Sequence, residues 1–287
     1  MKKDLYVEIT SEFLVALKEG VKPWVCPWEK RGMLALPVNM TTGNPYSGIN
    51  VLLLAMRSYQ AGFTSNEWVT FKQAKASGAT VRKGEKGTRC VFFKPVEKNV
   101  VNENGETETE AYTVINSFTV FNRDQLDGIE KPAVEPTWAP IADAEALCEA
   151  FDCVTVHGGD SAHYIPSVDR IHMPEREQFA KGEDYYATRL HEMAHATGHK
   201  SRLNRELIGK FGSDAYAFEE LVAEFTSWMV CSRIGLEGEM QHKSYLAHWI
   251  RILDFDKKAL FKAASLAQKA HNYMLARLED AQQDQAA

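Results

Sequence analysis

Residues 183–199 read EDYYATRLHEMAHATGH, and this stretch decides how the second half of the chain is interpreted. Its centre is His191-Glu192-Met193-Ala194-His195, in which the two histidines are four residues apart. Residues four apart lie on one face of an α-helix, one turn from each other. The two imidazoles can therefore converge on a single point, and the stretch predicts a helix that carries a metal site.

The spacing His-Glu-x-x-His is that of zinc proteases. Glu192 lies on a neighbouring face of the predicted helix, so we expect it to accept a proton from a metal-bound water and not to be a ligand. A catalytic zinc site needs a third protein ligand and an open position for water. Metzincins have a histidine six residues after the second histidine of the motif; here that residue is Ser201, which excludes this class.

A glutamate on a later helix is the other source of a third ligand. Residues 216–231 read YAFEELVAEFTSWMVC, which predicts a helix that packs inward. Its apolar side consists of Leu221, Phe225 and Trp228. Carboxylates on such a helix are costly unless they meet a cation. We assign Glu220 as the third ligand, with Glu219 as the alternative, and Glu224 as an acceptor for the outer N–H of a ligand imidazole. Solvated surface charges are the plainer interpretation of all three.

Two further side chains lie close to these motifs. Tyr216 begins the second predicted helix and is our candidate donor to a transition-state oxyanion, although packing in a core is the more common role of a tyrosine. His199 follows His195 by one turn, near the end of its helix, where a cation is favoured. We therefore do not count His199 as a ligand.

The rest of the chain alternates between helical and extended patterns. Expected helices cover residues 4–19, 50–61, 68–78, 141–151, 183–199, 216–235 and 243–281. Expected strands cover residues 88–98, 110–125, 153–156, 163–165 and 170–173. The stretch GIEKPAVEPTWAP at 128–140 contains three prolines and reads as a linker. We expect an α+β protein of two domains, residues 1–128 and 141–287, with the linker at 129–140.

Composition excludes several classes of protein. Hydrophobic residues make up 45% of the 287 residues and charged residues 25%, as in soluble globular proteins. No apolar run is long enough for a membrane-spanning helix, and the start, MKKDLYVEIT, lacks the apolar core of a secretory signal. An odd number of cysteines without Cys-x-x-Cys spacing argues against a disulfide framework and for a cytoplasmic location. They are Cys26, Cys90, Cys148, Cys153 and Cys231.

The net charge of −6 is unevenly distributed. Residues 1–130 carry 16 basic and 15 acidic residues, whereas residues 131–287 carry 17 and 24. Residues 70–95 alone hold seven basic residues and one acid, interleaved with aromatic residues. Single strands of nucleic acid are bound by aromatic rings that stack bases and by cations that follow phosphates, although core aromatics beside a solvated basic face give the same pattern. The candidate DNA-binding residues are Trp28, Trp68, Lys72, Lys75, Arg82, Lys83, Lys86 and Arg89.

Six motifs run through both halves of the chain. They are PVNMTTGNPYSGINVLLL (37–54), WVTFKQA (68–74), VRKGEKGT (81–88), YIPSVDRIHMP (164–174), HEMAHATGHKSRLNR (191–205) and YAFEELVAEF (216–225). With them the chain resembles, over nearly its whole length, the ArdC family of antirestriction proteins of conjugative plasmids and related mobile elements. The resemblance implies a single-stranded DNA-binding domain followed by a zincin-like metallopeptidase domain. It also implies that His191, His195 and Glu220 are metal ligands and that Glu192 is catalytic.

The sequence is therefore interpreted as a protein that protects incoming DNA from host restriction. Its mixed α/β N-terminal domain would bind single-stranded DNA, with duplex DNA left open, and its gluzincin-type C-terminal domain would hold Zn²⁺, or another divalent metal such as Mn²⁺. A host protein is a possible substrate, and no membrane partner is expected. Two alternatives stay open: a non-enzymatic coating protein for single strands with a structural metal site, and a zincin-type transcriptional regulator. Three protein ligands would favour catalysis and four a structural site.

Overall fold

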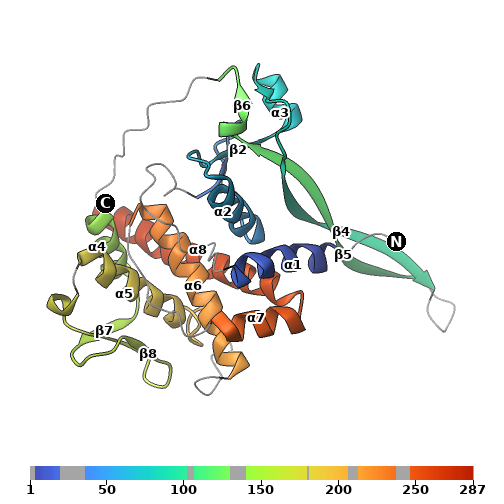
Figure 1. Cartoon of the computed structure of the whole chain (residues 1–287). Helices are drawn as coiled ribbons and strands as arrows, with labels where there is room; N and C mark the ends of the chain where they lie inside the picture. The colour runs from blue at the N-terminus through green and yellow to red at the C-terminus, as the bar shows by residue number, and fades with distance from the viewer. Residues whose placement is uncertain are drawn as a thin grey trace.

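Long helices and one long β-ribbon make up most of the computed structural model, which describes residues 4–19, 36–101, 107–129, 140–179, 181–205, 213–236 and 246–286. In Figure 1 the ribbon extends away from a body of packed helices, and a small sheet lies on the far side of that body. Helices and strands are interspersed along the chain, which confirms the expected α+β class.

The N-terminal part is a four-stranded sheet flanked by helices α1 (Leu5–Lys18), α2 (Ile49–Ala61) and α3 (Phe71–Ala76). The sheet order is β1-β2-β5-β4, formed by β1 (Val38–Asn39), β2 (Glu67–Thr70), β5 (Thr107–Asn122) and β4 (Thr88–Val101). Strands β4 and β5 pair antiparallel from Thr88↔Val120 to Val101↔Thr107. The two expected strands are thus confirmed as one hairpin. A second, two-stranded sheet joins β3 (Thr80–Val81) to β6 (Leu126–Asp127).

The expected helix at 68–78 is wrong at its start. Residues Glu67–Thr70 form β2, and the helix begins only at Phe71, with Thr70 as its N-cap in a capping box with Gln73. Trp68 pairs with Asn122 and has no exposed surface. A fully buried ring cannot stack a DNA base, so the assignment of Trp68 as a DNA-binding residue is wrong, and the side chain is part of the core.

In the described residues, the C-terminal part combines a small sheet with five α-helices. Strands β7 (Val154–His157), β9 (Arg170–Met173) and β8 (His163–Ile165) form one sheet in the order β7-β9-β8, which confirms the three short strands expected there. The helices are α4 (Pro140–Ala150), α5 (Gly182–Ala196), α6 (Asp214–Ile234), α7 (Leu246–Phe255) and α8 (Ala259–Ala286). The helical material expected at 243–281 is therefore two helices.

The largest hydrophobic core contains residues from both expected domains. Ile9, Phe13 and Leu17 of α1 belong to the same buried cluster as residues of α6, α7 and α8. The rings of Phe13 and Phe225 meet edge to face at a centroid distance of 6.3 Å. A second buried cluster lies between α4, α5, α6 and the small sheet. Helix α6 thus contributes to both cores.

Parts of the expected linker and of three other predictions lie outside the described residues. These are residues 130–139, residues 102–106 between the strands expected at 88–98 and 110–125, Trp28 and Cys26. The domain boundaries at 128 and 141 stay predictions. In the described part of the chain, no helix combines the length and the apolar character needed to cross a bilayer, and Cys90, Cys148, Cys153 and Cys231 are free thiols.

The shared core leads to a prediction about stability. Replacing Phe13 by Ala should lower the free energy of unfolding by about 3–5 kcal/mol, because the cavity lies between α1 and the C-terminal helices. Val15→Ala is the matched control, since Val15 is on the same helix and 55% exposed; its effect should stay within about 0.5 kcal/mol. Urea denaturation followed by circular dichroism measures both. Equal stability of Phe13→Ala and wild type would contradict the shared core.

Candidate functional site

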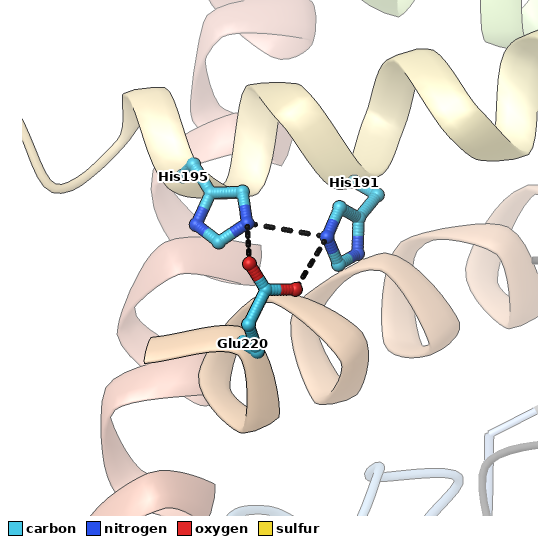
Figure 2. A group of neighbouring side chains, drawn as sticks. All are labelled: His191, His195 and Glu220. Atoms are coloured by element: carbon cyan, nitrogen blue, oxygen red, sulfur yellow. Dashed lines mark hydrogen bonds and ion pairs between the residues drawn. The ribbon is translucent and has the colours of Figure 1, made fainter. Parts of the chain in front are cut away.

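Helices α5 and α6 bring the candidate metal-binding side chains together. His191 and His195 are one turn apart on α5, and Glu220 is in the second turn of α6. Figure 2 shows the two imidazoles directed toward the Glu220 carboxylate from the helix above it. His191 and Glu220 are buried, and the His195 side chain is only 12% exposed.

The three side chains form a triangle whose corners are the two imidazole Nε2 atoms and the Glu220 carboxylate. The two Nε2 atoms lie 3.2 Å apart. Glu220 Oε2 lies 3.5 Å from His191 Nε2, and Glu220 Oε1 lies 3.5 Å from His195 Nε2. Within the described part of the chain, this is the group of histidine, cysteine and carboxylate residues whose ligand atoms gather closely enough to hold a metal ion.

The size of this triangle fits a metal ion. A tetrahedral zinc ion bound at about 2.1 Å requires about 3.4 Å between neighbouring ligand atoms. The two Nε2 atoms are 3.2 Å apart, and each lies 3.5 Å from a different oxygen of the Glu220 carboxylate, so all three groups are close enough to bind one ion. Two imidazoles and one carboxylate are also the ligand set of catalytic zinc sites that keep a fourth position for water.

The charges around the triangle indicate that it is built for a cation. Burial by itself would raise the pKa of the Glu220 carboxyl, but His191 and His195 outweigh it and hold that pKa well below its usual range. Burial lowers the pKa of His191. Burial also disfavours charge on His195, yet Glu219 and Glu220 raise its pKa to about 10. Both carboxylates thus favour a positive charge at the position of His195.

Glu219 lies on the other side of His195 from Glu220. Its Oε1 is 3.5 Å from His195 Nδ1, and its carboxylate also binds the Arg205 guanidinium. The geometry therefore places Glu220, and not Glu219, at the corner of the triangle. Arg205 was not predicted from sequence, because no residue spacing marks it as a partner of this helix pair.

Glu192, Glu224 and Tyr216 lie on the same two helices, whereas His199 follows the end of α5. Glu192 and Glu224 are buried, and Glu192 is not in the ligand group that the described residues form. Tyr216 is in the first turn of α6, where Ser213 caps its backbone N–H, and its side chain packs against the large core. His199 Nδ1 bonds the hydroxyl of Ser201 at 2.7 Å, outside the triangle. The catalytic roles of Glu192 and Tyr216 and the outer role of Glu224 stay predictions.

The candidate DNA-binding cations fall into two groups. Lys72, Lys75, Lys83 and Lys86 are exposed, and no ion pair joins them to another described residue. Arg82 and Arg89 are also exposed, but Arg82 pairs with Glu85 and Asp127, and Arg89 pairs with Glu8 at 2.6 Å. The four lysines are therefore available to a ligand, whereas the two arginines already hold parts of the chain together.

Phe71 is an exposed aromatic residue among these lysines that the site prediction left out. It begins α3, directly before Lys72, and is 58% exposed. Its ring contacts that of Phe121 edge to face at 6.4 Å. Gly87 leaves room for Phe121, since a Cβ there would lie 2.9 Å from the Phe121 ring. The exposure of one ring and the burial of the other, Trp68, could not be read from their similar sequence surroundings.

Two families match successive parts of the chain. Residues 3–121 match the family described as the N-terminal domain of anti-restriction factor ArdC. Residues 142–266 match the family of zincin-like metallopeptidases.

Individual relatives match nearly the whole chain. A DNA primase TraC of Escherichia coli is 40% identical over 96% of this chain, which spans only 20% of that primase. The uncharacterized protein y4eC of Sinorhizobium fredii is 37% identical over 98% of this chain and 95% of its own length.

Solved structures give the same result. The metal-free crystal structure of the antirestriction protein ArdC from plasmid R388 superposes with a TM-score of 0.80 and is 34% identical, covering 97% of this chain and 99% of that one. The Mn(II)-bound structure of the same protein gives a TM-score of 0.76 at 35% identity, covering 96% of this chain and 98% of that one. From these similarities over the full length, the chain belongs to the ArdC family of antirestriction proteins.

Proposed function

We propose that this protein protects the incoming DNA of a mobile element from restriction, by binding single-stranded DNA through residues 1–128 and by carrying a zinc metallopeptidase site in residues 141–287. The observation that carries the peptidase half is the triangle of His191, His195 and Glu220. The matched families and the ArdC of plasmid R388 support the antirestriction role.

The described site favours catalysis over a closed structural metal. Three side chains offer ligand atoms in the described part of the chain, which leaves a coordination position for water or substrate. A bound Zn²⁺ would lower the pKa of that water and polarise a scissile carbonyl. Glu192 would accept the water proton on a carboxylate oxygen and return it to the leaving amine. Tyr216 would donate its O–H to the oxyanion.

The metal itself is proposed as Zn²⁺ on the basis of its ligands. Two imidazoles and a carboxylate suit zinc, but they also suit other divalent ions such as Mn²⁺. The ArdC of plasmid R388 has a Mn(II)-bound structure, which supports the binding of a divalent cation by this protein as well. Elemental analysis of the purified protein identifies the resident metal, and zinc is the expected result.

The DNA-binding half is proposed from the four exposed lysines and Phe71. Helix α3 carries Phe71, Lys72 and Lys75, and the turn that carries Lys83 and Lys86 follows β3. Phe121 and Gly87 connect these two segments, because the Phe121 ring borders both Phe71 and Gly87. An exposed ring on the same helix as exposed lysines can stack on a base while the cations bind neighbouring phosphates.

The metal triangle leads to a prediction about zinc. Replacing His195 by Ala should abolish stoichiometric zinc binding, measured by elemental analysis and by competition with a chromophoric chelator. In wild type the affinity should rise about tenfold per pH unit from pH 6.5 to 8.5, because the metal must displace the proton of His195, whose pKa is raised to about 10. Full zinc retention by His195→Ala would refute the site, and a plateau above pH 7 would contradict the shifted pKa.

The role of Glu192 gives a second prediction. Glu192→Gln should keep the metal and lose hydrolysis of restriction-enzyme subunits by roughly 10²-fold or more, because the general base is removed. Glu177→Gln, at an exposed position, is the control and should leave both unchanged. Loss of metal from Glu192→Gln would make Glu192 a ligand instead. If wild type cleaves none of the subunits, the result favours the alternative of a non-enzymatic protein with a structural metal site.

The lysine and aromatic surface gives a third prediction, measured on the full chain with and without chelator. Phe71→Ala should weaken binding to single-stranded DNA by about 1–3 kcal/mol with little change in salt dependence. Phe255→Ala is the matched control, since Phe255 is 92% exposed on α7. The double variant Lys83→Ala/Lys86→Ala should reduce the slope of log affinity against log salt by about 1.4. Unchanged binding by all variants would place the DNA surface elsewhere.

A further inference from the structure

The side of His195 that faces away from the metal triangle is occupied by a buried ion pair. His195 Nδ1 lies 3.5 Å from Glu219 Oε1. Glu219 is 9% exposed, and the Arg205 side chain is 5% exposed. A buried carboxylate and guanidinium that contact one candidate ligand suggest that the pair acts on that ligand.

Arg205 binds Glu219 with two donors and is itself fixed. Its Nη2 donates to Glu219 Oε1 at 2.6 Å and its Nε donates to Oε2 at 3.2 Å. Its Nη1 donates to the Thr197 hydroxyl at 2.6 Å and its Nη2 to the Ala194 carbonyl at 2.8 Å. The guanidinium thus ties the Glu219 carboxylate to the last turn of α5, the helix that carries His195.

We propose that Glu219 and Arg205 are positioning residues that hold the His195 ring with its proton on Nδ1 and its Nε2 lone pair directed at the metal position. The inference rests on the metal site proposed above. An imidazole that binds a metal through Nε2 keeps its remaining proton on Nδ1, and this N–H needs an acceptor when it is buried. Glu219 is that acceptor.

The arrangement also counteracts an effect of Glu220. Glu220 Oε1 lies 3.5 Å from Nε2, so by itself it would favour a proton on the very atom that must be bare to bind a metal. Glu219 lies at the same distance from Nδ1 and offers the ring proton an equivalent acceptor on the other side. The two neighbouring glutamates therefore act on opposite nitrogens of one ring.

Arg205 explains how a second buried carboxylate is tolerated beside Glu220. Its charge compensates that of Glu219, and its planar donors fix both oxygens, so that Oε1 stays aimed at His195. A lysine would supply the charge at one point but could not fix both oxygens. The positioning role therefore belongs to the pair and not to Glu219 alone.

The test is the affinity of the full-length protein for Zn²⁺, measured by competition with a chromophoric chelator. Glu219→Gln should weaken it by about 10–100-fold, because the amide is uncharged and replaces one of the two oxygens that Arg205 holds with a donor NH₂ group. Arg205→Lys should weaken it less but in the same direction. Glu145→Gln is the matched control. Glu145 also accepts two hydrogen bonds from an arginine, Arg176, at 2.8 and 3.0 Å, but this pair is not part of the triangle. It should leave zinc affinity unchanged.

A spectroscopic readout separates positioning from simple loss of structure. In the zinc-loaded wild type, ¹⁵N–¹H spectra of labelled histidine should show His195 bound through Nε2 with a slowly exchanging Nδ1 proton. Coordination through Nδ1 would overturn the inference without any variant, and so would wild-type affinity in folded Glu219→Gln. If wild type binds no zinc, or His195→Ala binds it equally well, the proposed metal site fails instead.

Discussion

The packing of α5 against α6 is the constraint on which the rest of the structure depends. It buries Glu220 between two imidazoles, where a carboxylate is stable only beside positive charge. The helical repeat of α5 sets the distance between His191 and His195, and the position of α6 sets the third corner. A shift of either helix would separate the two imidazoles from the Glu220 carboxylate, so the chemistry of the site depends on helix packing and not on a loop.

Helix α6 also joins the two halves of the chain. One part of its surface carries the glutamates that meet α5, and another part holds Phe225 against Phe13 of α1. The N-terminal helix therefore stabilises the element that presents Glu220, although the sequence between them contains an entire sheet. The two halves differ in net charge, but side chains from both contribute to one hydrophobic core.

The parts of this architecture that were predictable have strong local signals. The His191–His195 spacing, the inward-packing glutamate helix and the short strands of the small sheet follow from periodicity, which reports local geometry. Trp68 was misassigned because an aromatic followed by Val69 and Thr70 suits a buried strand as well as a helix start, and only the pairing with Asn122 decides between them. Arg205 and the packing of α1 on α6 depend on contacts between distant segments, for which a single sequence holds no spacing rule.

The common core has a consequence for how such a chain can be inherited. Recombination near residue 130 would join one half to a different version of the other. Ile9, Phe13 and Leu17 would then pack against side chains of α6, α7 and α8 that are not complementary to them in shape. The two matched families are adjacent in this chain, and the TraC and y4eC relatives retain both over 96% and 98% of it. Because α1 packs on α6, α7 and α8, a change of core volume in one half has to be matched by a change in the other.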